Sequence, residues 1–239
     1  LHLLSRRQRQ MCIRDSYSAL SHIKETYPEY IPCVLLQMTL VAFSDIIQIA
    51  REWNSDGLLK SFVLSNIHGL SPNFINGVKT VDYEETKQLY LHILDAYEKH
   101  QDWVVLKIFL DECLAYWKDR PIIDAGQSVP MATCMPINSK IYIDSQMQIG
   151  ICEKVADKYR IGNVKNGIDW KRANEIVEEY YHKRVERCKY CPAIRMCDMC
   201  LTAVEYSDEQ WDILCHNERV YAQIFMFLYC EMAERGLIK

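Results

Sequence analysis

Four cysteines between residues 188 and 200 constrain this chain more than any other feature. They form two CxxC pairs, Cys188 with Cys191 and Cys197 with Cys200. A CxxC turn can direct two sulfur atoms toward one metal centre, and paired turns commonly hold zinc or an iron–sulfur cluster. The fold must therefore present a loop of thiolates to a metal centre, and the function should depend on what those sulfurs bind.

The composition favours a reducing compartment. The chain has 239 residues, 49% of them hydrophobic, and eleven cysteines. Small disulfide-dependent secreted domains have far fewer core residues, and an odd number of cysteines leaves one thiol without a disulfide partner. We therefore expect a cytoplasmic protein with metal-bound thiolates. A net charge of −4 and the lack of a long apolar run predict neither nucleic acid nor membrane as a partner.

Residues 1–16 differ from the rest of the chain. The basic segment from Arg6 to Asp15, RRQRQMCIRD, matches a translation of a transposon adapter that is used to prepare DNA for sequencing. The segment lacks helical or strand periodicity, and no apolar stretch follows it as a signal peptide would require. We expect residues 1–16 to be non-native, and the natural protein to continue upstream, so that this chain is a C-terminal fragment.

Residues 17–120 alternate between helical and strand patterns. Helices are predicted over 17–27, 46–53 and 83–101, and strands over 33–43 and 61–67. The apolar segment 103–117 fits either a helix or a strand. Such alternation predicts part of a parallel α/β sheet with helical crossovers, and it contains too few units for a complete (β/α) barrel.

A second domain is predicted at 121–239, and the linker Asp119–Val129, which contains Pro121 and Gly126, marks its start. The expected elements are a hairpin at 140–143 and 148–152, an extended segment at 160–164, and helices at 170–187 and 208–235. Asp169 is the expected N-cap of the first helix, and Ser207 to Gln210 forms a capping box for the second. The domain should therefore end in a long helix.

The cysteines after the linker resemble those of the SPASM domain, the auxiliary-cluster module at the C-terminus of radical S-adenosylmethionine (SAM) enzymes. The resemblance covers about residues 131–235 and begins at Cys134-Met-Pro136. That family has a cysteine on each side of a hairpin, a CxxC-x5-C-x3-C run and a final cysteine. This chain has two residues rather than three between Cys197 and Cys200, a gap that some peptide-modifying members share. Met147 stands where the family has its hairpin glycine.

The resemblance implies a small α+β domain with two [4Fe–4S] clusters. Four cysteines would fill every site of the outer cluster: Cys188, Cys191, Cys197 and Cys215. Three would hold the inner cluster: Cys134, Cys152 and Cys200. The fourth site of the inner cluster would be open or filled by a residue that the sequence does not identify. An open iron could bind a substrate group, whereas full ligation suits electron transfer.

The upstream half resembles the later strands and helices of a radical SAM barrel. Tyr27-Pro-Glu-Tyr30 before a strand, and Asp45-Ile-Ile after it, are similar to peptide-maturase members. Ser65, Asn66 and His68 follow a predicted strand, where barrel sites collect ligands. We expect Ser65 and Asn66 to contact SAM, and ordinary loop capping is the alternative. The defining CxxxCxxC loop, which would hold a third [4Fe–4S] cluster, is absent. This chain alone should therefore not cleave SAM, and no catalytic residue is assigned.

We expect the C-terminal portion of a radical SAM peptide maturase, which supports a thioether or other crosslink in a ribosomally made precursor peptide and exchanges electrons with a donor or acceptor protein. A sulfatase-maturing-type or other SPASM oxidoreductase is the second hypothesis. A non-enzymatic zinc module that binds a partner is the third. Cys33, Cys113 and Cys230 lie in apolar segments and are expected to be buried, inert thiols.

Overall fold

The computed structural model describes residues 2–40, 42–69, 79–118, 141–152, 155, 157–194, 196–197 and 199–238. The chain divides into two compact units. Unit 1 contains Leu1–Ile75, Gln88–Leu114 and Arg235–Lys239, and unit 2 contains Asn76–Lys87 and Ala115–Glu234. The linker predicted at 119–129 lies outside the described residues.

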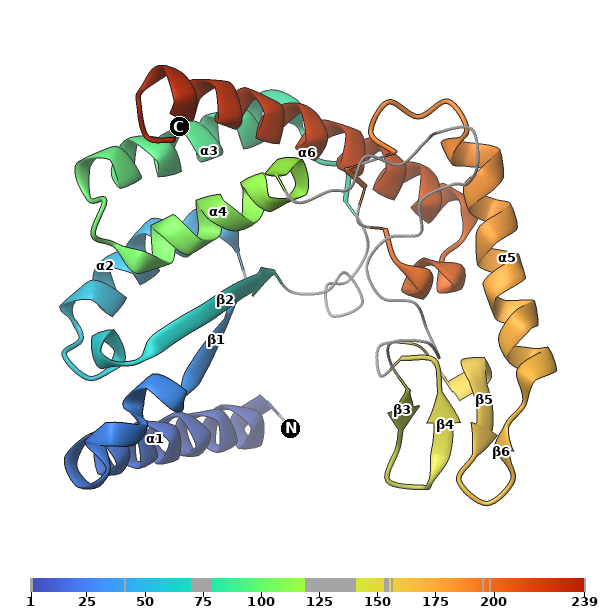
Figure 1. Cartoon of the computed structure of the whole chain (residues 1–239), viewed down its shortest axis with the longest axis horizontal. Coiled ribbons are helices and arrows are strands. Elements are labelled where there is room, and N and C mark those ends of the chain that lie inside the picture. Colours follow the sequence, from blue (N-terminus) through green and yellow to red (C-terminus); the bar gives the residue numbers. More distant parts are fainter. Residues whose placement is uncertain are drawn as a thin grey trace. The chain divides into compact units, whose positions relative to one another are not determined.

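Unit 1 is built on two parallel strands joined by a helix (Figure 1). β1 (Leu35–Leu40) leads through α2 (Ile46–Ser55) into β2 (Val63–Gly69). Parallel strands need a crossover of this kind because a tight turn cannot bring the chain back to the same end of the sheet. The parallel pairing predicted for these two strands is confirmed.

Two further helices, α3 (Tyr83–Lys99) and α4 (Val104–Lys118), contribute to the core of unit 1. The ring of Tyr90 on α3 stacks on that of Phe109 on α4, with centroids 5.7 Å apart. The segment 103–117, which fitted either a helix or a strand, is helical. Its buried side chains recur at helical spacing: Val105, Leu106, Phe109, Leu110, Cys113 and Leu114.

α1 (His2–Thr26) begins earlier than the sequence predicts. It includes the adapter-like segment, for which no regular structure was expected. The helix ends before Pro28, which restricts the residue that precedes it. The Tyr17 hydroxyl donates a hydrogen bond of 2.6 Å to the Asp56 carboxylate, and this bond raises the pKa of Tyr17 to about 12.

Unit 2 combines an antiparallel sheet with two long helices (Figure 1). The strands follow chain order: β3 (Tyr142–Ile143), β4 (Gln148–Gly150), β5 (Arg160–Asn163) and β6 (Gly167–Ile168). The helices are α5 (Trp170–Cys188) and α6 (Asp208–Glu234), and the cysteine loop and a 3-10 helix at Leu201–Glu205 connect them. The predicted hairpin, extended segment and helices are confirmed, although the hairpin strands are shorter than expected.

Both helices of unit 2 begin at the predicted caps. The Asp169 carboxylate accepts a hydrogen bond of 3.0 Å from the backbone N–H of Arg172. The backbone N–H of Ser207 donates to the Gln210 side chain at 2.9 Å, and the backbone N–H of Gln210 donates to the Ser207 hydroxyl at 3.3 Å. Each cap satisfies N–H groups that have no partner within the first helical turn.

The core of unit 2 lies where the sheet, α5 and the start of α6 meet. Trp211, Ile176 and Tyr180 are at most 1% exposed, and the rings of Tyr180 and Trp211 lie 6.1 Å apart. Cys197 and Met199 from the cysteine loop belong to the same buried cluster. The loop is therefore an integral part of this core.

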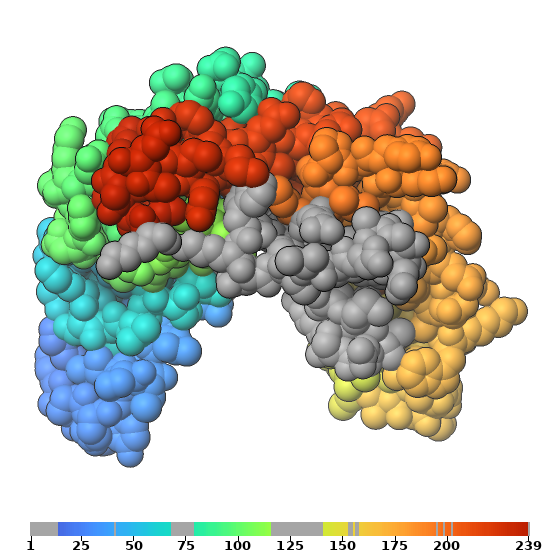
Figure 2. Space-filling view, turned by 45° about the horizontal axis from the view of Figure 1, so that its top comes forward, coloured from blue at the N-terminus to red at the C-terminus, as the bar shows by residue number. Residues whose placement is uncertain are grey.

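α6 buries one face and exposes the other. Its buried residues beyond the first turns recur every four positions: Val220, Ile224, Leu228 and Met232. Met226 and Tyr229 are 42% and 36% exposed, and residues of α6 reach the surface in Figure 2. Among the described helices, none combines the length and apolar character that crossing a membrane requires.

A substitution at Gly162 in β5 tests the backbone geometry of the sheet in unit 2. Its φ is +147°, and an added Cβ would collide with the carbonyl oxygen of Gly167. We expect Gly162→Ala to lower the free energy of unfolding by at least about 1 kcal/mol. Gly57→Ala is the matched control in unit 1, where a Cβ meets nothing within 4 Å, and it should raise stability by about 0.4–1 kcal/mol. Denaturant unfolding measures both, and an unchanged Gly162→Ala protein would contradict the sheet geometry.

Candidate metal centre

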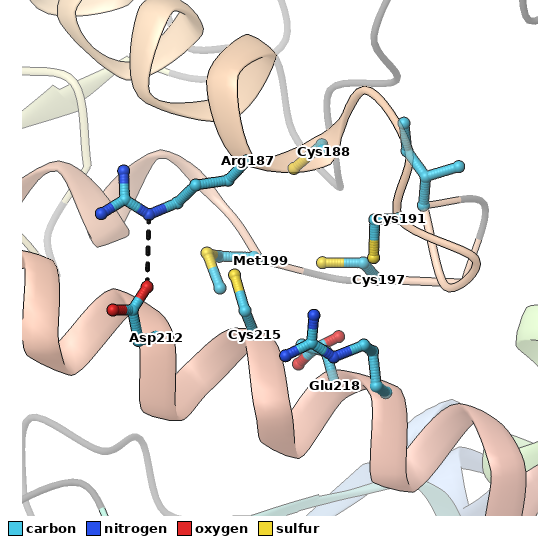
Figure 3. A pocket seen from close by; sticks show the side chains of 10 residues that line it. Arg187, Cys188, Cys191, Cys197, Met199, Asp212, Cys215 and Glu218 are labelled. Atoms are coloured by element: carbon cyan, nitrogen blue, oxygen red, sulfur yellow. Dashed lines mark ion pairs between the residues drawn. The ribbon is translucent and has the colours of Figure 1, made fainter.

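Four cysteines line one cavity of about 260 Å³ in unit 2 (Figure 3). Cys188 is the last residue of α5, and Cys215 lies on α6. Cys191 and Cys197 lie in the loop that follows α5. The sulfur atoms point into the same space (Figure 3). The fold therefore gathers thiols from two helices and a loop around one volume.

Backbone turns set the positions of the loop cysteines. The N–H of Cys191 donates to the carbonyl oxygen of Cys188 at 3.0 Å, which closes a turn directly after α5. The N–H of Cys197 donates to the carbonyl oxygen of Ala193 at 2.9 Å, which turns the chain back toward the helix. Ala193 and Cys197 are both buried, so packing holds this return in place.

The rest of the cavity wall is a mixture of soft and charged groups: Arg187, Ile194, Met199, Asp212, Glu218 and Arg219. Arg187 forms ion pairs with Asp208 at 3.0 Å and with Asp212 at 3.6 Å, and Figure 3 marks the second. The Met199 thioether adds a further sulfur to the wall. Sulfur ligands and partly neutralised charges suit a soft metal centre.

Burial raises the pKa of the Cys188 thiol, and the neighbouring Cys191 adds to the increase. Burial likewise raises the pKa of Cys215, with further contributions from Cys188 and Cys191. Arg187 acts in the opposite direction on both thiols. Without a metal these two thiols stay protonated at neutral pH. Metal binding must therefore displace their protons, which makes affinity depend on pH.

A buried arginine lies behind the cysteines. Arg184 is 0% exposed, and its Nη1 donates to the Tyr180 hydroxyl at 3.0 Å and to the carbonyl oxygen of Met199 at 2.7 Å. Its Nε and Nη2 have no hydrogen-bond partner among the described residues. Burial acts to lower the pKa of Arg184, but the net direction is upward because Tyr180, Cys197 and Cys188 lie nearby. A buried cation with unmade hydrogen bonds is costly unless an anion lies beside it.

Thiolates can hold a single zinc ion or an iron–sulfur cluster, and the two differ in how far apart their sulfurs stand. Tetrahedral zinc, with Zn–S bonds of about 2.3 Å, brings its sulfurs to about 3.8 Å from one another. In the described part of the chain, no three His, Cys, Asp or Glu side chains are placed to hold one metal ion. Cluster ligands stand farther apart because an iron atom lies between each thiolate and the centre. A cluster at these cysteines would occupy the cavity, and its negative charge would lie near the positive charge of Arg184.

Of the residues predicted to hold the inner cluster, the two that the structure describes, Cys152 and Cys200, do not line this cavity. Cys152 follows β4 and lines a second cavity of about 260 Å³, which also includes the 2.8 Å ion pair between Arg160 and Asp144. Cys200 immediately precedes the 3-10 helix. Cys134 lies outside the described residues. The inner cluster therefore stays a prediction.

The residues predicted to contact SAM lie within β2 rather than after it. The Ser65 hydroxyl donates a hydrogen bond of 3.0 Å to the carbonyl oxygen of Leu36, where the register of the strand pair shifts. Its oxygen also lies 3.3 Å from the Asn66 side-chain oxygen. Ser65 therefore satisfies an irregular point in the strand pairing, and the contact of Ser65 and Asn66 with SAM stays a prediction.

The three cysteines expected to be buried and inert differ from one another. Cys113 on α4 is buried, as expected. The expectation is wrong for Cys33 and Cys230, which are exposed. Cys33 lies in the 3-10 helix Pro28–Cys33, none of whose residues is buried, and Cys230 lies on the exposed face of α6. Apolar neighbours in the sequence do not determine which way a side chain points.

Sequence reasoning did not identify Arg184, Arg187 and Met199 as part of the site. The two arginines precede Cys188 by four residues and by one, and residues four apart lie on one helix face. The four-residue spacing from Cys188 could therefore have indicated that Arg184 lies on the same side of the helix as the proposed ligand. The role of Met199 depends on its carbonyl oxygen and on the fold of the loop, which leave no pattern in the sequence.

Comparison of the chain with protein-family models, with curated proteins and with solved structures finds no match.

The exposure of the other thiols predicts a pattern of alkylation. Burial raises the pKa of Cys113 to about 12, so at pH 8 it is almost entirely the unreactive thiol. In the folded chain we expect iodoacetamide to label Cys33 and Cys230 readily and Cys113 only after denaturation. Peptide mass spectrometry measures the labelling, and the denatured chain is the control. Equal labelling of Cys113 and Cys33 in the folded chain would contradict the packing of α4.

Proposed function

We propose that this chain is the C-terminal portion of a radical SAM peptide maturase. Its outer auxiliary [4Fe–4S] cluster is held by Cys188, Cys191, Cys197 and Cys215. Its inner cluster is held by Cys134, Cys152 and Cys200. The upstream residues 17–120 belong to a partial (β/α) barrel in which Ser65 and Asn66 contact SAM.

One observation carries the proposal. The cysteines that line the cavity are the same four that the resemblance to SPASM domains assigns to one cluster. Cys200 belongs to the same CxxC-rich loop but does not line this cavity. Spacing along the loop alone does not separate Cys197 from Cys200, because each forms half of the same CxxC pair. The grouping in space therefore supports a division of the cysteines into two ligand sets.

The surroundings of the cavity favour an iron–sulfur centre over structural zinc. The cavity leaves room between the sulfurs, and Arg184 places positive charge behind Cys188 and Cys197. A bound [4Fe–4S] cluster would supply reversible one-electron transfer, at a potential that depends on burial, charge and hydrogen bonds to sulfur. The buried loop residues Ala193 and Met199 would keep water from part of the site.

The proposal assigns this chain a supporting role in radical chemistry on a ribosomally made precursor peptide. The auxiliary clusters would accept or relay electrons during formation of a thioether or other crosslink, in exchange with an electron donor or acceptor protein. The chain contains no CxxxCxxC motif, so the cluster that cleaves SAM is not among those it holds. Thiolate-ligated clusters suit a reducing compartment, and the proposed location is the cytoplasm.

The metal content of the full chain tests the proposal. After purification and reconstitution without oxygen, we expect about eight irons and about eight sulfides per chain, as two [4Fe–4S] clusters require. Iron, sulfide and zinc are measured on the same sample. About one zinc and no sulfide would support the non-enzymatic zinc module instead.

A matched pair of cysteine variants tests the ligand assignment. Cys191→Ala removes a thiol that lines the cavity and should lose about half of the iron, one cluster of two. Cys33→Ala removes an exposed thiol of unit 1 and should lose none. Iron analysis of the two variants and the parent chain, prepared in parallel, gives the result. Equal iron in all three proteins would show that Cys191 is not a ligand.

A further inference from the structure

We infer that the buried guanidinium of Arg184 is the counter-charge of the outer cluster and sets its reduction potential. This inference rests on the proposed function, because it requires a cluster at the four cysteines. It assigns Arg184 a positioning and tuning role rather than a ligand role.

Arg184 is held rigidly. It lies on α5, four residues before Cys188, and its Nη1 donates to two oxygens, those of Tyr180 and Met199. The Tyr180 hydroxyl itself donates to the carbonyl oxygen of Met199 at 2.6 Å. The guanidinium is therefore fixed between a helix and the returning loop, and it cannot swing out to water.

Arg184 has no carboxylate partner in the part of the chain that the structure describes. Among the described residues no carboxylate pairs with it, and its Nε and Nη2 make no hydrogen bond. Arg187, one turn later on the same helix, provides the contrast, since it pairs with Asp208 and Asp212. Burying an unpaired cation costs several kcal/mol in general. An anionic occupant of the adjacent cavity would remove that cost.

The groups beside Arg184 are the proposed ligands. Cys188 lies one turn after Arg184 on α5, and Cys197 lies two residues before Met199, whose carbonyl oxygen accepts a hydrogen bond from Arg184. Both cysteines line the cavity. A thiolate-ligated cluster becomes more negative when it gains an electron. A fixed positive charge therefore stabilises the reduced state more than the oxidised state and raises the potential. Removing the charge should lower the potential.

The test uses two neutral variants of the full chain and a matched control. Arg184→Met and Arg184→Gln both remove the buried charge. Arg184→Gln also keeps an N–H donor, so it provides the test if Arg184→Met does not fold. Lys183→Met removes the same charge from the adjacent residue of α5, a side chain that is 28% exposed and paired with Glu179. A potentiometric titration followed by electron paramagnetic resonance measures each potential. The signal that is lost in Cys191→Ala identifies the outer cluster.

We expect the outer-cluster signal to shift to a more negative potential in both Arg184 variants and to stay unchanged in Lys183→Met. The signal of the other cluster should not move. In the metal-free chain, the melting temperature of Arg184→Met should equal or exceed that of the parent, because the variant removes an uncompensated buried charge. A large loss of metal-free stability would instead assign Arg184 to the protein core alone.

The outcomes separate the inference from the proposed function. A reconstituted chain that holds iron and sulfide, with the same outer-cluster potential in Arg184→Gln and the parent, overturns the role of Arg184 and leaves the cluster assignment intact. A chain that holds zinc and no sulfide overturns both. A negative shift confined to the outer cluster supports both.

Discussion

The hydrogen bonds that converge on the carbonyl oxygen of Met199 are the constraint on which the proposed metal centre depends. Tyr180 and Arg184 donate to this oxygen at 2.6 Å and 2.7 Å. Both donors are buried and lie one turn apart on α5, so the returning cysteine loop is fixed to the helix that ends in Cys188. These bonds hold the second half of the loop against α5.

Charge is distributed around the site in two ways. Arg187 meets carboxylates near the surface, where an ion pair contributes little to stability. Arg184 is buried without a carboxylate among the described residues, where an unpaired charge is expensive. A core that contains such a cation beside several thiols is suited to an anionic occupant. The cavity and the cation are therefore parts of one electrostatic arrangement.

Unit 1 has a simpler arrangement, in which the crossover helix α2 connects the two parallel strands β1 and β2. The backbone N–H of Ile67 in β2 donates to the Glu112 carboxylate on α4 at 2.8 Å, which ties the strand to that helix. Parallel strands are usually covered on both faces, yet Leu35 and Val63 are 62% and 44% exposed. These exposures fit the proposal that the pair belongs to a partial barrel.

The sequence by itself determined the local features of this protein. Most of the helices, the two strand segments of unit 1, the Asp169 cap and the capping box at Ser207 were predictable because each depends on residues a few positions apart. The spacing of the cysteines indicated a metal centre for the same reason. Only the tertiary structure decided which thiols share a cavity, why Arg184 is buried, and why Cys33 and Cys230 are exposed. These three features depend on contacts between segments that are distant in the sequence. The free energy of such contacts comes from packing and burial, and neither requires a fixed number of residues between the segments that meet.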